Sequence, residues 1–281
     1  MNDARLPQME TWRFIDSGYR DGYENMAIDL ALTESYRGTP TLRVYGWKPP
    51  AISLGFHQSL LDLDLTRCAE DGIDVVYRPT GGRAVLHAAE ITYAVVLGPQ
   101  SALYDQRILP VYERISQGIL AALQQLYIPI AFERAGKNPQ NYSQGELGSL
   151  CYAASVKYEI GHAGRKLIGS AQRRFGDVVL QHGSILMGQE HLKLVDYLSR
   201  QDAQWQRTAK KMMLQKTVCL NDLSPAPLTY EQLALALRAG FAWQWNLNLL
   251  EDGLTAEERD KTRRLADALR REIEQGSPRE T

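Results

Sequence analysis

The sequence lacks long apolar runs and a strong net charge. No stretch of about 18 consecutive apolar residues occurs, so we expect no membrane-spanning helix and no membrane partner. Its 32 Lys and Arg residues nearly balance 33 Asp and Glu residues, for a formal net charge of −1. We therefore expect no nucleic acid as partner, because such binding depends on an excess of positive charge.

Cysteine is also scarce. The three cysteines, Cys68, Cys151 and Cys219, are widely spaced and odd in number. This argues against a disulfide framework or a zinc site and indicates a reducing compartment. The first residues also lack the apolar core of a signal peptide, so we expect a cytoplasmic protein. Cys68 is expected to be a small core residue.

Common nucleotide and metal motifs are missing as well. The chain contains no GxGxxG, no GxxxxGK[ST], no HExxH and no Cys/His cluster, so none of the corresponding dinucleotide, phosphate or metal sites is expected. What is present is ordinary for a soluble globular protein, with 44% hydrophobic and 23% charged residues. A length of 281 residues allows one large domain or two small ones.

Apolar periodicity predicts strands and helices mixed along the chain. The Pro225-Ala226-Pro227 segment suggests a boundary between a main body, 1–225, and a helical extension packed on it, 226–281. We expect the strand over 90–97 to pair with the one over 74–77. The strands are predicted over 11–19, 41–47, 51–54, 74–77, 90–97, 132–134 and 178–187. The helices are predicted over 23–36, 60–71, 111–127, 190–198, 229–243 and 255–274. Thr229 and Gln232 at the start of the helix over 229–243 resemble a capping box.

A glycine pair follows the strand predicted over 74–77. Gly81 and Gly82 lie between Arg78 and Arg83, and His87 comes shortly after them. Glycines allow a ligand to approach the backbone, whose N–H groups can hold an anion or a carbonyl oxygen. A hairpin turn with two exposed arginines explains the pattern equally well, and spacing alone leaves both interpretations open.

The stretch 145–188 holds the second candidate site. Cys151 lies in a polar loop bounded by glycines, and Lys166 follows a strand predicted over 153–160 and a turn over 161–164. Such a hairpin could bring the two side chains to one cleft. A lysine ammonium lowers the pKa of a nearby thiol, and the pair could then support thioester chemistry. The alternative is a core cysteine and a solvated lysine.

Other residues near this pair are also candidates. The segment 169–172, Gly-Ser-Ala-Gln, is predicted to be a small-residue turn. His87, His162 and His182 could each pair with the cysteine, although a lone histidine is more often structural.

Several segments, in order along residues 12 to 200, resemble the lipoate–protein ligase A and octanoyltransferase superfamily. The segments are 25–29 (NMAID), 42–55 (LRVYGWKPPAISLG), 78–87 (RPTGGRAVLH), 164–172 (GRKLIGSAQ) and 181–186 (QHGSIL). The resemblance implies an α+β fold of the biotin/lipoate protein ligase kind, similar to class II aminoacyl-tRNA synthetases. We then expect a mixed sheet flanked by helices, with 1–225 as the catalytic domain.

The resemblance also implies residue roles. Cys151 would be the nucleophile and Lys166 the activating base, with no metal and no cofactor. Ala88 stands where such sequences usually have an acidic residue, which leaves the role of His87 open. The residues implied to line the acyl site are Arg78, Gly81, Gly82, Arg83, His87, Gly169, Ser170, Ala171 and His182.

Within the superfamily, Cys151 makes the chain resemble the LipM-type octanoyltransferases. That resemblance implies transfer of octanoate from octanoyl-acyl carrier protein to a lysine of an apo lipoyl domain, in H protein or an E2 subunit. A monomer is expected. Two alternatives stay open: a ligase that activates free lipoate or octanoate with ATP and Mg²⁺, and a non-catalytic protein that binds acylated or carrier proteins.

Overall fold

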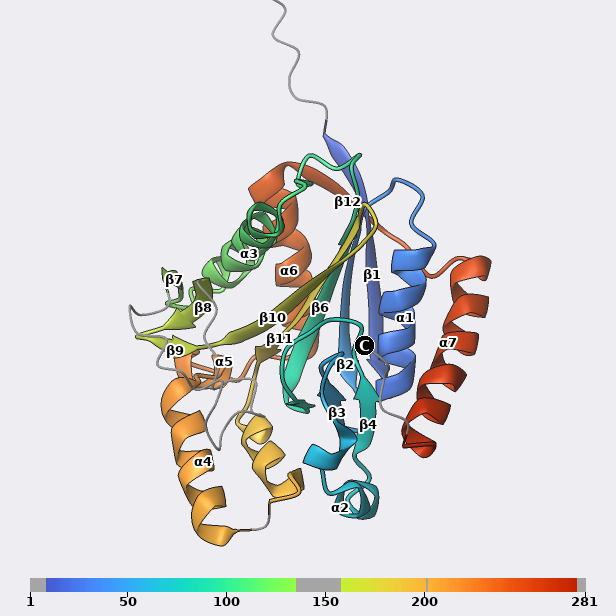
Figure 1. Cartoon of the computed structure of the whole chain (residues 1–281). Helices are drawn as coiled ribbons and strands as arrows, with labels where there is room; N and C mark the ends of the chain where they lie inside the picture. Colours follow the sequence, from blue (N-terminus) through green and yellow to red (C-terminus); the bar gives the residue numbers. More distant parts are fainter. Residues whose placement is uncertain (1–8, 135–157, 201, 277–281) are drawn as a thin grey trace, which may run out of the picture.

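The computed structural model describes residues 9–134, 158–200 and 202–276 (Figure 1). Its centre is a six-stranded sheet with the strand order β10-β11-β6-β2-β1-β12. β1 runs parallel to both of its neighbours, whereas the other pairs are antiparallel, so the sheet is mixed. The strands are β1 (Glu10–Arg20), β2 (Thr41–Trp47), β6 (Glu90–Leu97), β10 (Ile168–Phe175), β11 (Val178–Leu186) and β12 (Leu247–Glu251).

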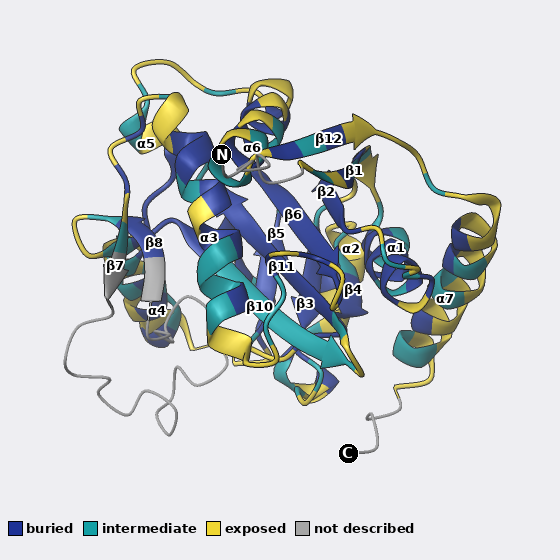
Figure 2. Cartoon of the chain, turned by 90° about the horizontal axis from the view of Figure 1, so that it is seen from above, coloured by how far each residue is buried: buried dark blue, intermediate teal, exposed yellow. Residues whose placement is uncertain are grey.

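Helices cover both faces of this sheet, as Figures 1 and 2 show. On one face lie α3 (Ile108–Gln125) and α6 (Tyr230–Trp245). On the other lies α1 (Gly22–Glu34), and α7 (Ala256–Glu274) packs on the outer side of α1. All residues of β2 and β6 are buried between these layers. The predicted mixed sheet flanked by helices is confirmed.

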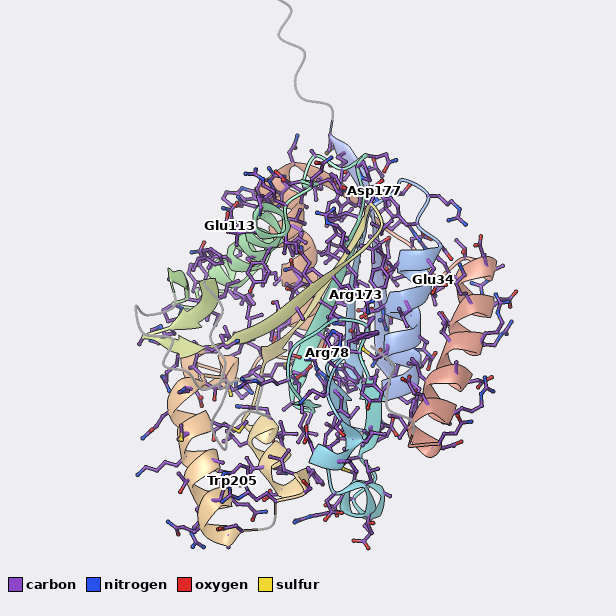
Figure 3. The ribbon with its side chains drawn as sticks, in the orientation of Figure 1. Glu34, Arg78, Glu113, Arg173, Asp177 and Trp205 are labelled. Carbon is purple, nitrogen blue, oxygen red and sulfur yellow. The ribbon has the colours of Figure 1, made fainter. Side chains whose placement is uncertain are left out.

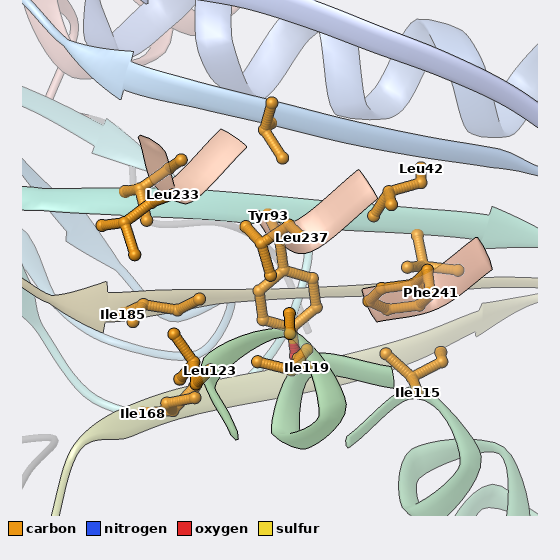
Figure 4. Packing of buried hydrophobic residues seen from close by; sticks show 14 of the residues in the cluster. Leu42, Tyr93, Ile115, Ile119, Leu123, Ile168, Ile185, Leu233, Leu237 and Phe241 are labelled. Atoms are coloured by element: carbon orange, nitrogen blue, oxygen red, sulfur yellow. The ribbon is translucent and has the colours of Figure 1, made fainter. Parts of the chain in front are cut away.

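The larger core lies between the sheet and the α3–α6 pair. Figure 4 shows side chains of both helices meeting around Tyr93 of β6. Gly240 of α6 packs directly on α3, since a Cβ there would lie 2.4 Å from the backbone nitrogen of Ala122. The predicted capping box at the start of α6 is confirmed, with Thr229 and Gln232 satisfying each other's backbone N–H groups.

Two small sheets lie beside the central one. The first has the order β4 (Asp74–Tyr77), β3 (Ala51–Leu54), β5 (Val85–His87), and the second β7 (Ala131–Arg134), β8 (Tyr158–His162), β9 (Arg165–Lys166). The remaining elements are the 3₁₀ helices η1 (Leu60–Asp62) and η3 (Glu190–Tyr197) and the helices α2 (Leu65–Glu70), α4 (Ala203–Lys216) and α5 (Leu220–Leu223). No helix in the described ranges is long and apolar enough to cross a membrane.

The predicted pairing of 90–97 with 74–77 is wrong. β6 pairs with β2 and β11, whereas β4 pairs in parallel with β3. The proline pair at Pro49–Pro50 ends β2, and the chain that follows begins a separate sheet instead of extending the central one.

The predicted turn over 169–172 is also wrong. These residues belong to β10 and pair in register with β11, from Gly169 opposite Ser184 to Gln172 opposite Gln181. Small residues here serve close packing, because a Cβ on Gly183 would lie 2.6 Å from the carbonyl oxygen of Gly169. Small residues of this kind are typical of turns as well as of closely approaching strands, so composition favoured the wrong structure.

Smaller differences concern helices and the hairpin turn. The single helix predicted over 60–71 is interrupted, because Asp64 caps α2 by accepting a hydrogen bond from the Arg67 N–H. The segment 190–198 forms a 3₁₀ helix. The turn before Lys166 is present, with positive φ at Ala163 (51°) and Gly164 (73°). Cys68 is buried, as predicted.

The division at residue 225 stays a prediction. Beyond it, α6 contributes Leu233, Leu237 and Phe241 to the larger core. β12, which the periodicity did not predict, adds an edge strand to the central sheet next to β1.

Candidate active site

A pocket of about 460 Å³, its open mouth included, lies between the small β4-β3-β5 sheet and the β10–β11 edge of the central sheet. Gly81 and Gly82 are exposed and form its outer lip, whereas Met26 and Tyr45 belong to the buried core. The lining residues are Met26, Tyr45, Trp47, Ser53, Arg78, Gly81, Gly82, Val85, His87, Thr92, Gly169, Ser170, Ala171, His182, Gly183 and Ser184.

Arg78 shapes the glycine loop, residues 78–83. Its buried guanidinium donates to the carbonyl oxygens of Gly81 (2.9 Å), Arg83 (2.7 Å) and Ser53 (2.9 Å). The backbone N–H groups of Gly81 and Gly82 form no hydrogen bond with any residue in the described ranges. They are therefore donors that could hold a carbonyl oxygen at the lip of the pocket.

Two contacts hold the glycine loop from outside. Gly55 packs against it so closely that a Cβ there would lie 1.9 Å from the carbonyl oxygen of Gly82. On the other side, Arg173 of β10 donates to the carbonyl oxygen of Pro79 at 2.8 Å and lies over the ring of Phe56. Figure 3 labels Arg173 together with Arg78 of the glycine loop. The loop is thus fixed to both sheets that enclose the pocket.

His182 of β11 connects the loop to the core. Its Nδ1 lies 2.9 Å from a carboxylate oxygen of Asp29, and its Nε2 lies 2.7 Å from the Thr80 hydroxyl. Asp29 also accepts hydrogen bonds from Arg43 at 2.6 Å and from the Tyr45 hydroxyl at 2.9 Å. With Nδ1–H donating to the carboxylate, Nε2 accepts the hydroxyl hydrogen of Thr80.

The charge state of Asp29 follows from these partners. Burial alone would raise the pKa of this carboxyl, but Arg43, His182 and Tyr45 outweigh it and lower the pKa below the ordinary value. The Arg43–Asp29 ion pair is fully buried on both sides. An ionised carboxylate beneath His182 therefore anchors the glycine loop through Thr80.

His87 lies in a second buried network. Its ring stacks on Trp47, with centroids 4.0 Å apart, and its Nε2 lies 2.8 Å from the Ser53 hydroxyl. Its Nδ1 lies 2.8 Å from a carboxylate oxygen of Glu90. Burial raises the pKa of Glu90, but His87, Thr92 and Ser184 lower it below its usual range. Glu90 thus supplies the acidic partner that Ala88 could not.

The β10–β11 wall is built from small residues. Gly169, Ser170 and Ala171 line the pocket, and the Ser170 hydroxyl is held 2.8 Å from the Tyr93 hydroxyl. Among the residues that the structure describes, no carboxylate lines the pocket itself, because Asp29 and Glu90 lie behind their histidines. The interior therefore suits an uncharged, mostly apolar chain.

Most of the predicted acyl-site residues meet at this pocket. Arg78, the two loop glycines, His87, the three small residues of β10 and His182 all line it. Arg83 does not, and one of its buried guanidinium nitrogens has no hydrogen-bond partner among the described residues. His162 lies in β8 and its ring contacts the carbonyl of Pro129. The roles assigned to all these residues stay predictions.

The predicted catalytic pair is described only in part. Cys151 lies outside the described residues. Lys166 lies in β9, is 8% exposed, and its carbonyl oxygen accepts a hydrogen bond from the Val218 N–H at 3.0 Å. The next strand, β10, runs directly into the pocket wall at Gly169.

Sequence reasoning missed the residues that support the histidines. Asp29 and Thr80 lay within segments already noted for their family resemblance, and Glu90 follows His87 by three positions. Their role depends on contacts such as His182 with Asp29, which are 153 positions apart. No group of three or more His, Cys, Asp or Glu residues that could hold a metal occurs among the described residues.

Known proteins similar to this chain were found by sequence and by structure. The model of the family described as "Lipoyl protein ligase A/B catalytic domain" matches residues 21–242. The octanoyltransferase LipM of Carboxydothermus hydrogenoformans is 36% identical, covering 92% of this chain and 95% of that protein. The LipM of Symbiobacterium thermophilum is likewise 36% identical, covering 92% and 96%.

Solved structures agree on the fold. The bipartite lipoate protein ligase of Thermoplasma acidophilum superposes with a TM-score of 0.75 at 20% identity, covering 92% of each chain. A lipoate-protein ligase A bound with ATP superposes with a TM-score of 0.72 at 19% identity, covering 92% of this chain and 94% of that one. The predicted biotin/lipoate protein ligase fold is confirmed.

Proposed function

Because the chain belongs to the lipoyl protein ligase A/B catalytic domain family, and within it to the LipM octanoyltransferases, we propose that it transfers octanoyl groups to lipoyl domains in lipoate biosynthesis. It is an acyltransferase. The acceptor is a lysine of an apo lipoyl domain, in H protein or an E2 subunit. The donor is octanoyl-acyl carrier protein, and the enzyme acts as a cytoplasmic monomer.

The reaction proceeds in two steps through Cys151. Its thiolate attacks the carbonyl carbon of the donor thioester and forms a new carbon–sulfur bond. The carbon–sulfur bond to the carrier breaks, and the carrier thiolate takes a proton from the Lys166 ammonium. The amine of the acceptor lysine then attacks the enzyme thioester, and an amide forms as the Cys151 thiolate leaves. Lys166 stabilises the Cys151 thiolate as an ammonium, and once it has given its proton to the carrier thiolate, its neutral amine takes the proton that the attacking amine loses.

The pocket beneath the glycine loop is the observation that carries this proposal. An octanoyl chain buried there gains about 0.8 kcal/mol per CH₂ group removed from water. The N–H groups of Gly81 and Gly82 are the donors for the carbonyl oxygen, which becomes negatively charged during attack. His182 and His87 act as supports for the loop and the pocket wall.

Intact-protein mass spectrometry tests the thioester route. Wild type and Cys151→Ala are mixed with octanoyl-acyl carrier protein without ATP. We expect a hydroxylamine-labile octanoyl adduct on the wild type alone, which is chased onto added apo lipoyl domain. Lys166→Ala should slow both formation and chase of the adduct, with the pocket intact.

Two other outcomes would refute the proposal. Transfer that appears only with ATP and free octanoate, and that survives Cys151→Ala, would indicate a ligase. Binding of the carrier protein without any adduct or transfer would indicate a non-catalytic binding protein.

A further inference from the structure

Helix α4 carries positive charge only. Its sequence, AQWQRTAKKMMLQK, contains four lysines or arginines and no acidic residue, in a chain whose net charge is −1. By contrast, the long surface helix α7 mixes charges of both signs. The buried side of α4 packs through Trp205, Ala209 and Met213 against the core beneath the β4-β3-β5 sheet.

The opposite side of α4 faces solvent. Arg207, Lys211 and Leu214 are exposed at helical spacing, and Leu214 is 45% exposed. Lys210 is neutralised by Asp196 at 2.6 Å, whereas neither Arg207 nor Lys211 forms an ion pair with a described residue. The exposed face, which we call the α4 face (Arg207, Lys211 and Leu214), therefore combines uncompensated positive charge with one apolar side chain.

The C-terminal end of α4 adjoins the strand that carries Lys166. The helix ends at Lys216, and the next residue, Thr217, forms a parallel bridge with Lys166 itself. Figure 1 shows α4 extending away from β9, on the side of the molecule opposite α7. At 1.5 Å per residue, Lys211 and Arg207 lie about 9 and 15 Å along the helix from that bridge.

We propose that the α4 face is the docking surface for the acidic face of the carrier protein that donates the octanoyl group. This inference rests on the proposed function. Charge complementarity of this kind steers association and sets orientation. We assign the face to the donor because the carrier presents its thioester on a long prosthetic arm, which can reach from α4 to the strand that carries Lys166.

The test compares two double variants with the same change of charge. Arg207→Glu with Lys211→Glu reverses the α4 face, and Arg264→Glu with Arg271→Glu reverses two exposed arginines of α7. Each enzyme is acylated by octanoyl-acyl carrier protein and, separately, by octanoyl-N-acetylcysteamine, a small thioester without a carrier. Affinity for the carrier protein is also measured directly, by fluorescence anisotropy of a labelled carrier.

For the α4 variant we expect the KM for the carrier donor to rise about tenfold or more, with a matching loss of affinity. Its KM for the small thioester and for the apo lipoyl domain should stay at the wild-type value, and the α7 variant should match wild type throughout. Arg207→Gln with Lys211→Gln should give a smaller rise. Salt should raise the wild-type KM for the carrier more than that of the charge-reversed enzyme.

Several results would overturn the inference. An unchanged KM for the carrier would place docking elsewhere, and a rise confined to the lipoyl domain would make α4 an acceptor surface. A rise for the small thioester as well would show a general structural defect. A wild type that the carrier protein does not acylate would refute the proposed function, and anisotropy would still decide whether α4 binds the carrier.

Discussion

Replacing Asp29 by Asn should destabilise the protein strongly. The carboxylate is fully buried and lies 2.6 Å from the Arg43 guanidinium, which is equally buried. Removing its charge leaves an uncompensated cation in the core and weakens the hydrogen bonds from Tyr45 and His182. Breaking a buried ion pair from one side typically costs about 3–5 kcal/mol, and we expect a loss of this size.

Urea denaturation followed by tryptophan fluorescence measures the effect. The matched control is Glu24→Gln, which breaks the exposed Arg20–Glu24 pair, where side chains are 47% and 38% exposed. Such a surface pair contributes about 0–1 kcal/mol, so this control should unfold close to wild type. A loss below about 1 kcal/mol for Asp29→Asn would refute the reasoning.

The difference in unfolding free energy between wild type and Asp29→Asn should depend on pH in a definite direction. The folded-state pKa of Asp29 lies below the ordinary value, so its ionised form stabilises the folded state above about pH 4. This contribution is lost as the pH falls below that value toward the folded-state pKa. The stability difference between wild type and Asp29→Asn should therefore be constant near neutral pH and shrink in acid. A difference that grows in acid would contradict the assignment.

Three further predictions concern packing and thiols. Gly55→Ala should displace the glycine loop, because the added Cβ would lie 1.9 Å from the carbonyl oxygen of Gly82. The kcat/KM for acyl transfer should then fall well below the wild-type value, and unchanged kinetics would contradict this loop geometry. Burial raises the pKa of Cys68 to about 11 and of Cys219 to about 12, so iodoacetamide near pH 8 should label neither thiol in the folded protein. Peptide mass spectrometry checks this, and the unfolded protein, in which both thiols should be labelled, is the control. Gly240→Ala should lower the free energy of unfolding, measured in urea, by about 1–3 kcal/mol, because the added Cβ would push α6 away from α3. The control Gly253→Ala, where a Cβ meets nothing within 4 Å, should be near neutral, and equal stability of the two variants would contradict this packing.

Much of the fold could be predicted because local patterns determine local structure. The strands over 41–47, 51–54 and 74–77 occur at the predicted residues, and Thr229 begins α6 with the predicted capping box. The segments that resemble known relatives also identified the glycine loop and the small residues that line the pocket. These features depend on residues close together in the sequence, where side-chain type and spacing are sufficient.

Only the tertiary structure determines which distant segments of the chain lie next to one another. Periodicity indicates which face of a strand is buried but not which strand lies next to it, so β4 was paired wrongly and β12 was missed. The same holds for the site: Asp29 and Glu90 became its charged supports through contacts that no local pattern encodes. A buried carboxylate needs its partners to be brought to it, and only the packing of α1, β2 and β11 around the pocket supplies those of Asp29.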